Sequence, residues 1–164
     1  MAEARYDAER FLDDILAIVK ANLNTEITAI QAEKDILLGS SNFTLKTVSD
    51  NAYFDSLDEG VANYDPFIYF GIEDDPIVPM EGAGAENIRA FFYVVLHNSF
   101  KDKNVYKRML RYARALKQIT EKNFDKISQI GNIRVEAMTP TNFQDLESNT
   151  FYKMAGISLS LSIA

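Results

Sequence analysis

The sequence predicts an α+β fold in which two main helices pack on one face of a mainly antiparallel sheet of four to five strands. Residues 88–97, IRAFFYVVLH, form the most apolar run of the chain and are typical of a central strand. Residues 104–123 follow with helical periodicity. Residues 157–163 alternate apolar residues with serines, as a half-buried strand does. The expected order is helix, strand, strand, helix, strand, strand.

Length and composition indicate a single globular domain over residues 1–164. The chain has 47% hydrophobic and 25% charged residues and lacks cysteine, which excludes disulfides and thiolate metal sites. We expect no signal peptide and no membrane span, because no run approaches the ~18 apolar residues that a span needs. The net charge of −7 disfavours a general role in wrapping nucleic acid.

The first helix is predicted over residues 8–23, where apolar residues recur at spacings of three and four. These residues are Leu12, Ile15, Leu16, Val19 and Leu23. Asn24 or Thr25 is expected to break or re-cap the helix, because both residue types favour helix starts. A second short helix or a bent continuation should then reach about residue 34.

The next stretch predicts strands separated by long loops. Residues 43–49 carry alternating β-formers and should make a short exposed strand, while residues 67–72 make a second strong strand. Residues 50–65 are rich in Asp, Asn, Ser and Gly, and residues 74–87 hold two prolines and two glycines. Both stretches are expected to be long loops, which are commonly functional or part of an interface.

Two further strands are predicted after the second long helix. Residues 133–138 follow a Gly-Asn break and read as a strand, and a polar loop over residues 139–150 leads to the closing strand. Such a sheet has exposed edges, and pairing between neighbouring copies is one way to cover them.

The second long helix separates an apolar face from a basic face within residues 103–122. The basic face consists of Lys103, Lys107, Arg108, Arg111, Arg114, Lys117 and Lys122. An ordinary solvated face is the first interpretation. Contact with acids on another copy, such as those of the first helix, is the second, and contact with nucleic acid is the third.

No cluster of residues in the sequence has the pattern of a catalytic site, so we expect no enzyme and no cofactor. His97 is the only histidine, and no nucleophile motif accompanies it, which favours a strand-end histidine with a backbone or solvent partner. The Gly82-Ala83-Gly84 segment lacks a third glycine and a following helix, which favours a flexible connection over a phosphate site.

Two acidic runs could supply oxygen ligands to a hard cation. They are Asp55, Asp58 and Glu59, and Glu73, Asp74 and Asp75. Neither run has the spacing of a calcium-binding loop, and solvated loop acids are the favoured interpretation, so we predict no metal site.

Aromatic residues around the first long loop are candidates for interface anchors, because aromatics are enriched at interface centres. They are Tyr53, Phe54, Tyr64 and Phe67. Packing beneath the loop is an equally strong interpretation.

Three stretches together carry a resemblance to a known family. They are ERFLDDILAIVKANL near the start, IRAFFYVVLHN with NVYKRMLRYARALKQI in the middle, and FYKMAGISLSLSIA at the end. Their order and spacing resemble the tail terminator proteins of tailed bacteriophages and the related neck proteins of the head-to-tail joint. The resemblance rests on element order and size, without a signature motif.

The resemblance implies a structural virion protein, made in the host cytoplasm, that forms a homo-oligomeric ring, usually a hexamer. Such a ring caps the tail tube and meets the head-side connector, while DNA only passes through its channel and no membrane is involved. The predicted interface residues are Lys107, Arg108, Arg111, Arg114, Tyr53, Phe54 and Tyr64. The alternatives are a small metal-dependent enzyme that uses the acidic loops, and a nucleic-acid-binding module that uses the basic helix.

Overall fold

The computed structural model describes residues 8–57, 59–73, 78–79, 86–98, 103–145 and 150–163, and confirms the α+β class. Its main elements follow the predicted order, with short helical turns and strands added between them. In chain order they are α1 (Ala8–Leu38), η1 (Gly39–Ser41), β1 (Tyr53–Phe54), η2 (Glu59–Asn63), β2 (Phe67–Ile72), β3 (Val78–Pro79), β4 (Glu86–His97), α2 (Val105–Lys122), α3 (Phe124–Ser128), β5 (Asn132–Asp145) and β6 (Thr150–Ile163).

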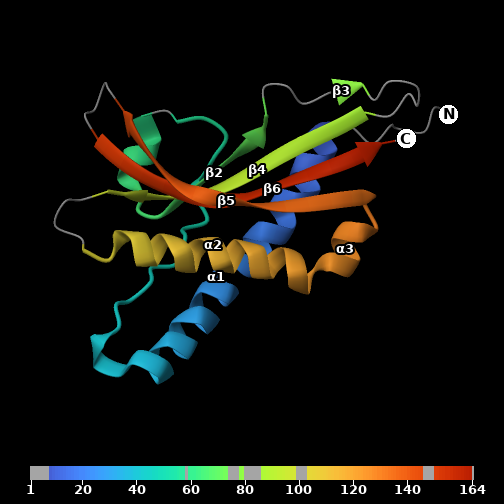
Figure 1. Ribbon diagram of the computed structural model, residues 1–164. Coiled ribbons are helices and arrows are strands. Elements are labelled where there is room, and N and C mark those ends of the chain that lie inside the picture. Colours follow the sequence, from blue (N-terminus) through green and yellow to red (C-terminus); the bar gives the residue numbers. More distant parts are fainter. Residues whose placement is uncertain are drawn as a thin grey trace.

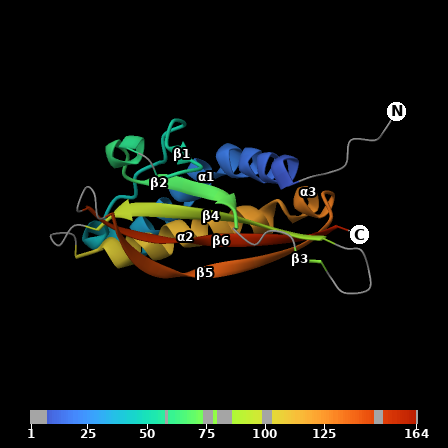
Figure 2. The same ribbon diagram turned by 90° about the horizontal axis from the view of Figure 1, so that it is seen from above.

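The sheet is built around β4, which confirms the central strand that the apolar run predicts. The strand order is β1-β2-β4-β6-β5, and β3 pairs with one end of β4. The short β1 runs parallel to β2, whereas every other pairing in the described residues is antiparallel. Because β4 and β6 both lie inside this order, the long strand β5 forms one edge of the sheet (Figure 2).

The core lies between the sheet and the two long helices. Phe92 of β4 and Ile157 of β6 face each other in the ladder and are fully buried. They belong to one hydrophobic cluster with Met109 and Leu116 of α2 and Ile27 of α1. Figure 1 shows α2 lying along one face of the sheet, with α1 crossing behind α2.

Helix α1 is a single helix of 31 residues, so the predicted break at Asn24 or Thr25 is wrong. The reason lies in the side chain of Asn24. Its amide Nδ2 donates to the Val48 carbonyl, and its Oδ1 accepts from the Val48 backbone N–H, both at 2.8 Å. The amide is therefore used in a tertiary contact and does not compete with the helix's own hydrogen bonds.

The predicted strand over residues 43–49 is also wrong, since this segment has no regular secondary structure. Leu45 and Val48 are buried, but their spacing of three positions does not fit the alternation of a strand. The segment lies against the helices instead of joining the sheet. Its backbone bonds to helix side chains: Leu45 N–H donates to Gln31 Oε1, and the Lys46 carbonyl accepts from the Tyr112 hydroxyl, each at 2.7 Å.

Strand β5 is longer than the strand predicted over residues 133–138. Strand β5 continues to Asp145, through most of the loop expected over residues 139–150, and β6 begins at Thr150. A register shift between Met138 and Thr141 accommodates Pro140, which supplies no N–H to a ladder. The sequence shows the proline as a break, but the pairing with β6 resumes beyond it.

The two other predicted loops are partly described. The stretch over residues 50–65 contains β1 and η2, so it is more ordered than its composition indicates. Of the connection over residues 74–87, residues 74–77 and 80–85 lie outside the described residues.

Candidate functional site

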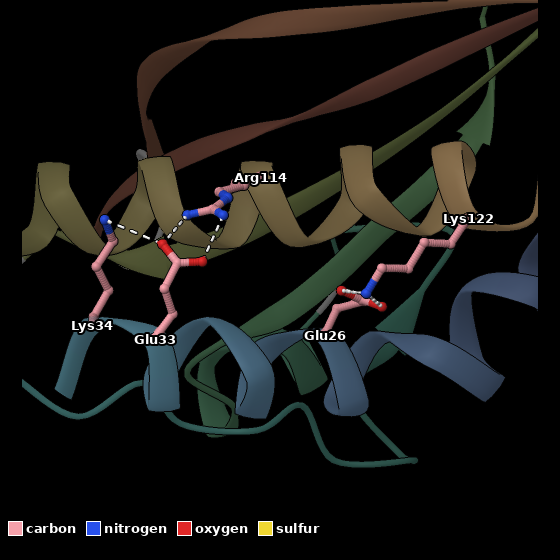
Figure 3. A network of polar contacts seen from close by, with 5 residues as sticks. All are labelled: Glu26, Glu33, Lys34, Arg114 and Lys122. Carbon is pink, nitrogen blue, oxygen red and sulfur yellow. Dashed lines mark hydrogen bonds and ion pairs between the residues drawn. The ribbon is translucent and has the colours of Figure 1, made fainter. Parts of the chain in front are cut away.

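The basic face of α2 meets acidic residues of α1 in the same chain. Arg114 donates from both terminal nitrogens to the two carboxylate oxygens of Glu33, each at 2.8 Å. Lys122 Nζ contacts both oxygens of Glu26, at 2.7 and 2.9 Å. Figure 3 shows the two pairs side by side between the helices. Residue numbers rise along α1 as they fall along α2, so the helices run antiparallel.

The hydrogen bond between Arg114 and Glu33 shifts the pKa of both groups. The Arg114 hydrogen bond holds the pKa of Glu33 below its ordinary value, and the same bond raises the pKa of Arg114. Glu26 is 6% exposed, although its partner Lys122 lies largely in solvent. In the amide orientation that satisfies both neighbours, Gln118 donates to Glu26 and accepts from Arg114. The two ion pairs thus form one network, which we call the α1–α2 network.

Arg108 and Arg111 contact the segment that follows α1. The Arg111 guanidinium lies 4.0 Å from the ring centroid of Phe43, and that of Arg108 lies 5.4 Å from it. Arg111 is only 8% exposed and donates to Asn42 Oδ1 at 2.6 Å. Burial lowers the pKa of Arg111. Both arginines therefore hold residues 42–43 against α2.

The structure divides the four predicted basic interface residues. Arg108, Arg111 and Arg114 contact their own chain, whereas Lys107 is exposed. From the sequence, the acids of α1 were expected to contact the basic face only if they came from another copy. A signal for the internal contact does exist: Glu26 and Glu33 lie seven residues apart, beside the apolar stripe that includes Ile27 and Ile30.

The predicted aromatic anchors lie beneath the loop that carries them. The Phe54 ring contacts those of Tyr64 and Phe67, with centroid distances of 5.6 and 5.8 Å. Tyr53 is half-buried under Lys20, whose Nζ lies 4.8 Å from the ring centroid. Burial, and then the charge of Asp50, raises the pKa of Tyr53 to about 12. These residues stabilise the loop, in line with the packing interpretation.

A groove of about 520 Å³ is lined by residues of the paired strands β2 and β4 and by Leu12 of α1. We call it the β2 groove. Its apolar walls are Leu12 of α1, Ile72 of β2 and an aromatic group formed by Tyr69, Phe91 and Tyr93. The three rings lie 5.1 to 6.4 Å apart between centroids. The sequence analysis did not identify this site, because its walls come from separate strands and a helix.

The β2 groove also carries negative charge. Asp55 and Glu73 line it, and Glu73 forms an ion pair of 3.2 Å with Arg89. Burial, and then the charges of Glu73 and Tyr69, raise the pKa of Tyr93. An aromatic wall beside carboxylates suits an apolar group that carries or adjoins a cation.

The candidate residues for metal and phosphate chemistry are only partly described. Asp58, Asp74, Asp75 and the segment over residues 82–84 lie outside the described residues. Within the described part of the chain, no group of three acidic or histidine side chains could hold a metal ion.

The ring of His97 packs against aromatic side chains. Its ring meets that of Tyr152 edge-on, with 5.1 Å between centroids, and Tyr152 stacks on Phe143. The Nε2 atom is buried and accepts or donates no hydrogen bond within the described residues.

Comparisons with known proteins leave the function to be argued from the structure. No protein-family model matches the sequence, and a search of curated proteins finds no significant match. Among the helices that the structure describes, none combines the length and apolar character that crossing a membrane requires.

Proposed function

We propose that this protein is the subunit of a homo-oligomeric ring of the phage tail terminator or neck type, acting by assembly and without turnover. The resemblance in element order supplies the class of protein. The observation that carries the proposal is the free edge of β5. A ring subunit needs surfaces that remain unsatisfied in the single chain, and a long free sheet edge is such a surface.

Strand β5 comprises 14 residues, Asn132–Asp145. It pairs with β6 on one side, and no strand of the described residues pairs with its other side. Such an edge leaves backbone N–H and C=O groups open to another chain. The bulge near Pro140 interrupts the edge, which leaves Asn132–Met138 as its regular part.

Electrostatics support a channel rather than a nucleic-acid-binding surface. Three cations of the basic face, Arg111, Arg114 and Lys122, contact other parts of the same chain. The chain as a whole carries a net charge of −7. A ring with this character lets DNA pass without strong attachment to its wall. For this reason we rank the nucleic-acid-binding module below the ring.

The proposal also assigns partners. One face of the ring, a hexamer in this proposal, meets the tail tube protein and the other meets the head-side connector in the virion. The small metal-dependent enzyme ranks lower, because the described residues offer no ligand cluster on which to base it.

The test is the native mass of the purified protein, measured by light scattering after size exclusion over a concentration series. We expect a species of six 18.5-kDa subunits, seen as a closed ring with a central hole by electron microscopy. If the free protein is monomeric, incubation with purified tail tubes should produce rings at the tube ends. A monomer that does not bind tail tubes would overturn the proposal, and so would open filaments in place of rings.

A further inference from the structure

The regular part of the β5 edge carries one cation and one anion on the same face. Arg134 and Glu136 lie two positions apart, and alternate residues of a strand point to the same side of a sheet. Arg134 Nε contacts Glu136 Oε1 at 3.1 Å, and the two side chains are 80% and 40% exposed. Their register partners on β6 are Ser160 and Ser158, so neither charge faces a charged residue of that strand. Figure 2 shows β5 along the outer edge of the sheet.

The other face of the same segment is apolar. It carries Ile133, Val135 and Ala137, whose register partners on β6 are all buried residues of the core. Ile133 and Val135 are themselves half-buried against that core, on the side of the sheet that α2 covers. A strand added to this edge would therefore extend the core on one face and meet the charged pair on the other.

The segment is complementary to itself when two copies run antiparallel with their Val135 residues opposite each other. In that register Arg134 of each copy lies opposite Glu136 of the other, so two ion pairs form across the join. A slip of two residues in either direction would place two arginines or two glutamates opposite each other, which is unfavourable. A slip of one residue would place the apolar face of one copy beside the charged face of the other. The side chains therefore select a single register.

Two exposed aromatic side chains of the helical layer lie near β5. Tyr106 of α2 is 52% exposed, and Lys153 Nζ lies 5.2 Å from the centroid of its ring. The same Nζ donates to Asn142 Oδ1 of β5 at 2.9 Å. Phe124 is 57% exposed and begins α3, which packs against both α2 and β5. A chain that adds to the β5 edge would therefore find aromatic surface beside it as well as backbone hydrogen-bonding groups.

We propose that two copies of this chain pair along β5 about a two-fold axis at Val135 and so form one continuous antiparallel sheet. The partner is a second copy because the charges of the edge complement themselves, which is what a two-fold contact requires. Pairing supplies hydrogen-bond partners to the backbone groups of the edge. It also brings Arg134 and Glu136 of each copy against their opposites in the other.

The dimer goes beyond the proposed ring and does not depend on it. A ring places β5 of each copy against a different surface of the next copy, so the dimer must open before a ring closes. Because the ring is the larger species, a rising concentration or a tail tube shifts the balance towards it. The dimer is the form expected at the low end of a concentration series, where it keeps the edge from pairing with unrelated chains.

The test reverses each charge of the edge. Arg134→Glu places acids opposite each other at the two-fold axis, and Glu136→Arg places arginines there, so each variant should dimerise about 100-fold more weakly than the parent. The double variant Arg134→Glu/Glu136→Arg exchanges the charges and should dimerise as the parent does. The matched control is Lys46→Glu, at an exposed position in the segment that packs against α1 and α2, and it should also dimerise normally. Sedimentation velocity measures association, and circular dichroism establishes that each variant is folded.

An equimolar mixture of the two single variants should form a one-to-one dimer, because one edge then carries two acids and the other two arginines. In this cysteine-free chain, Val135→Cys should form a disulfide-linked dimer on oxidation, since directly opposite residues have Cα atoms about 4.5 to 5.5 Å apart. Thr141→Cys, beyond the bulge, should not.

Three results would each overturn the pairing. They are a parent that shows no dimer at any concentration, single variants that dimerise as the parent does, and a mixture that stays monomeric. None of them bears on the ring, which is judged by a six-subunit mass and by binding to tail tubes. A dimer that never forms rings would support the pairing and count against the ring alone.

Discussion

At the scale of single residues, the main electrostatic feature is a buried carboxylate with a solvent-exposed partner. Glu26 is almost fully buried at the α1–α2 interface, and Lys122 reaches it from the surface. A buried carboxylate costs free energy unless hydrogen bonds and an opposite charge compensate it. Lys122 therefore stabilises the fold mainly by keeping Glu26 from being left unpaired.

Replacing Lys122 with methionine should lower the free energy of unfolding by about 1 to 2 kcal/mol, because Glu26 keeps only its contact with Gln118. Lys117→Met is the matched control. Lys117 pairs with Glu121 on the exposed surface of the same helix, so the change should stay within about 0.5 kcal/mol. Urea unfolding monitored by circular dichroism measures both. Equal effects would show that Glu26 does not depend on Lys122.

At the scale of elements, α1 and the segment over residues 42–49 behave as one unit. The segment turns back after α1 and runs antiparallel to it without forming a strand. Its backbone groups form hydrogen bonds with side chains of both α1 and α2. Asn24 is the central link because its amide bonds both the N–H and the carbonyl of Val48. This contact explains why an asparagine in mid-helix continues the helix.

Asn24→Ala should lower the free energy of unfolding by about 2 kcal/mol, since two partly buried backbone groups of Val48 lose their partner. Asn22→Ala, two positions earlier, is the control. The Asn22 amide donates only to the Ile18 carbonyl of its own helix, and alanine has the better helix propensity. Its effect should stay within about 0.5 kcal/mol of zero in urea titrations. A neutral Asn24→Ala would contradict the role given to this contact.

The elements that the sequence predicts well are those whose local pattern agrees with their packing. Strand β4 and helix α2 are found within two residues of their predicted ends, because apolar periodicity directly reflects which face is buried. The errors at Asn24 and at residues 43–49 have one cause. Both depend on hydrogen bonds between residues far apart in the sequence, 24 positions for Asn24 with Val48 and 66 for Lys46 with Tyr112, which no local window contains.

The functional residues were harder to predict for the same reason. The basic face of α2 is visible in the sequence, but its pairing with Glu26 and Glu33 requires knowing that α1 lies antiparallel beside it. The β2 groove joins residues from Leu12 to Tyr93, so its acids and aromatics gain a common site only after folding.

At the scale of the whole molecule, part of the positive charge of α2 is used inside the chain. Arg114 and Lys122 pair with Glu33 and Glu26 of α1, and the chain as a whole carries a net charge of −7. A protein of this kind should repel the phosphate backbone at long range.

Mixed-sequence duplex DNA should accordingly bind with a dissociation constant weaker than about 10⁻⁴ M at physiological salt, outside the usual range of non-specific binders. Fluorescence anisotropy with a labelled 30-base-pair duplex, repeated at low salt, measures this. A known DNA-binding domain serves as the positive control. Micromolar affinity that weakens steeply with salt would favour the nucleic-acid-binding module instead.

The position of β6 inside the sheet affects how the chain folds while it is synthesised on the ribosome. Strand β6 follows all other strands in the sequence, yet it lies between β4 and β5. Until it leaves the exit tunnel, β4 lacks one neighbour and β5 has no place in the sheet, so the nascent chain exposes apolar strands. Translation that stops before β6 should yield fragments for proteases to remove, which would keep incomplete subunits out of any assembly.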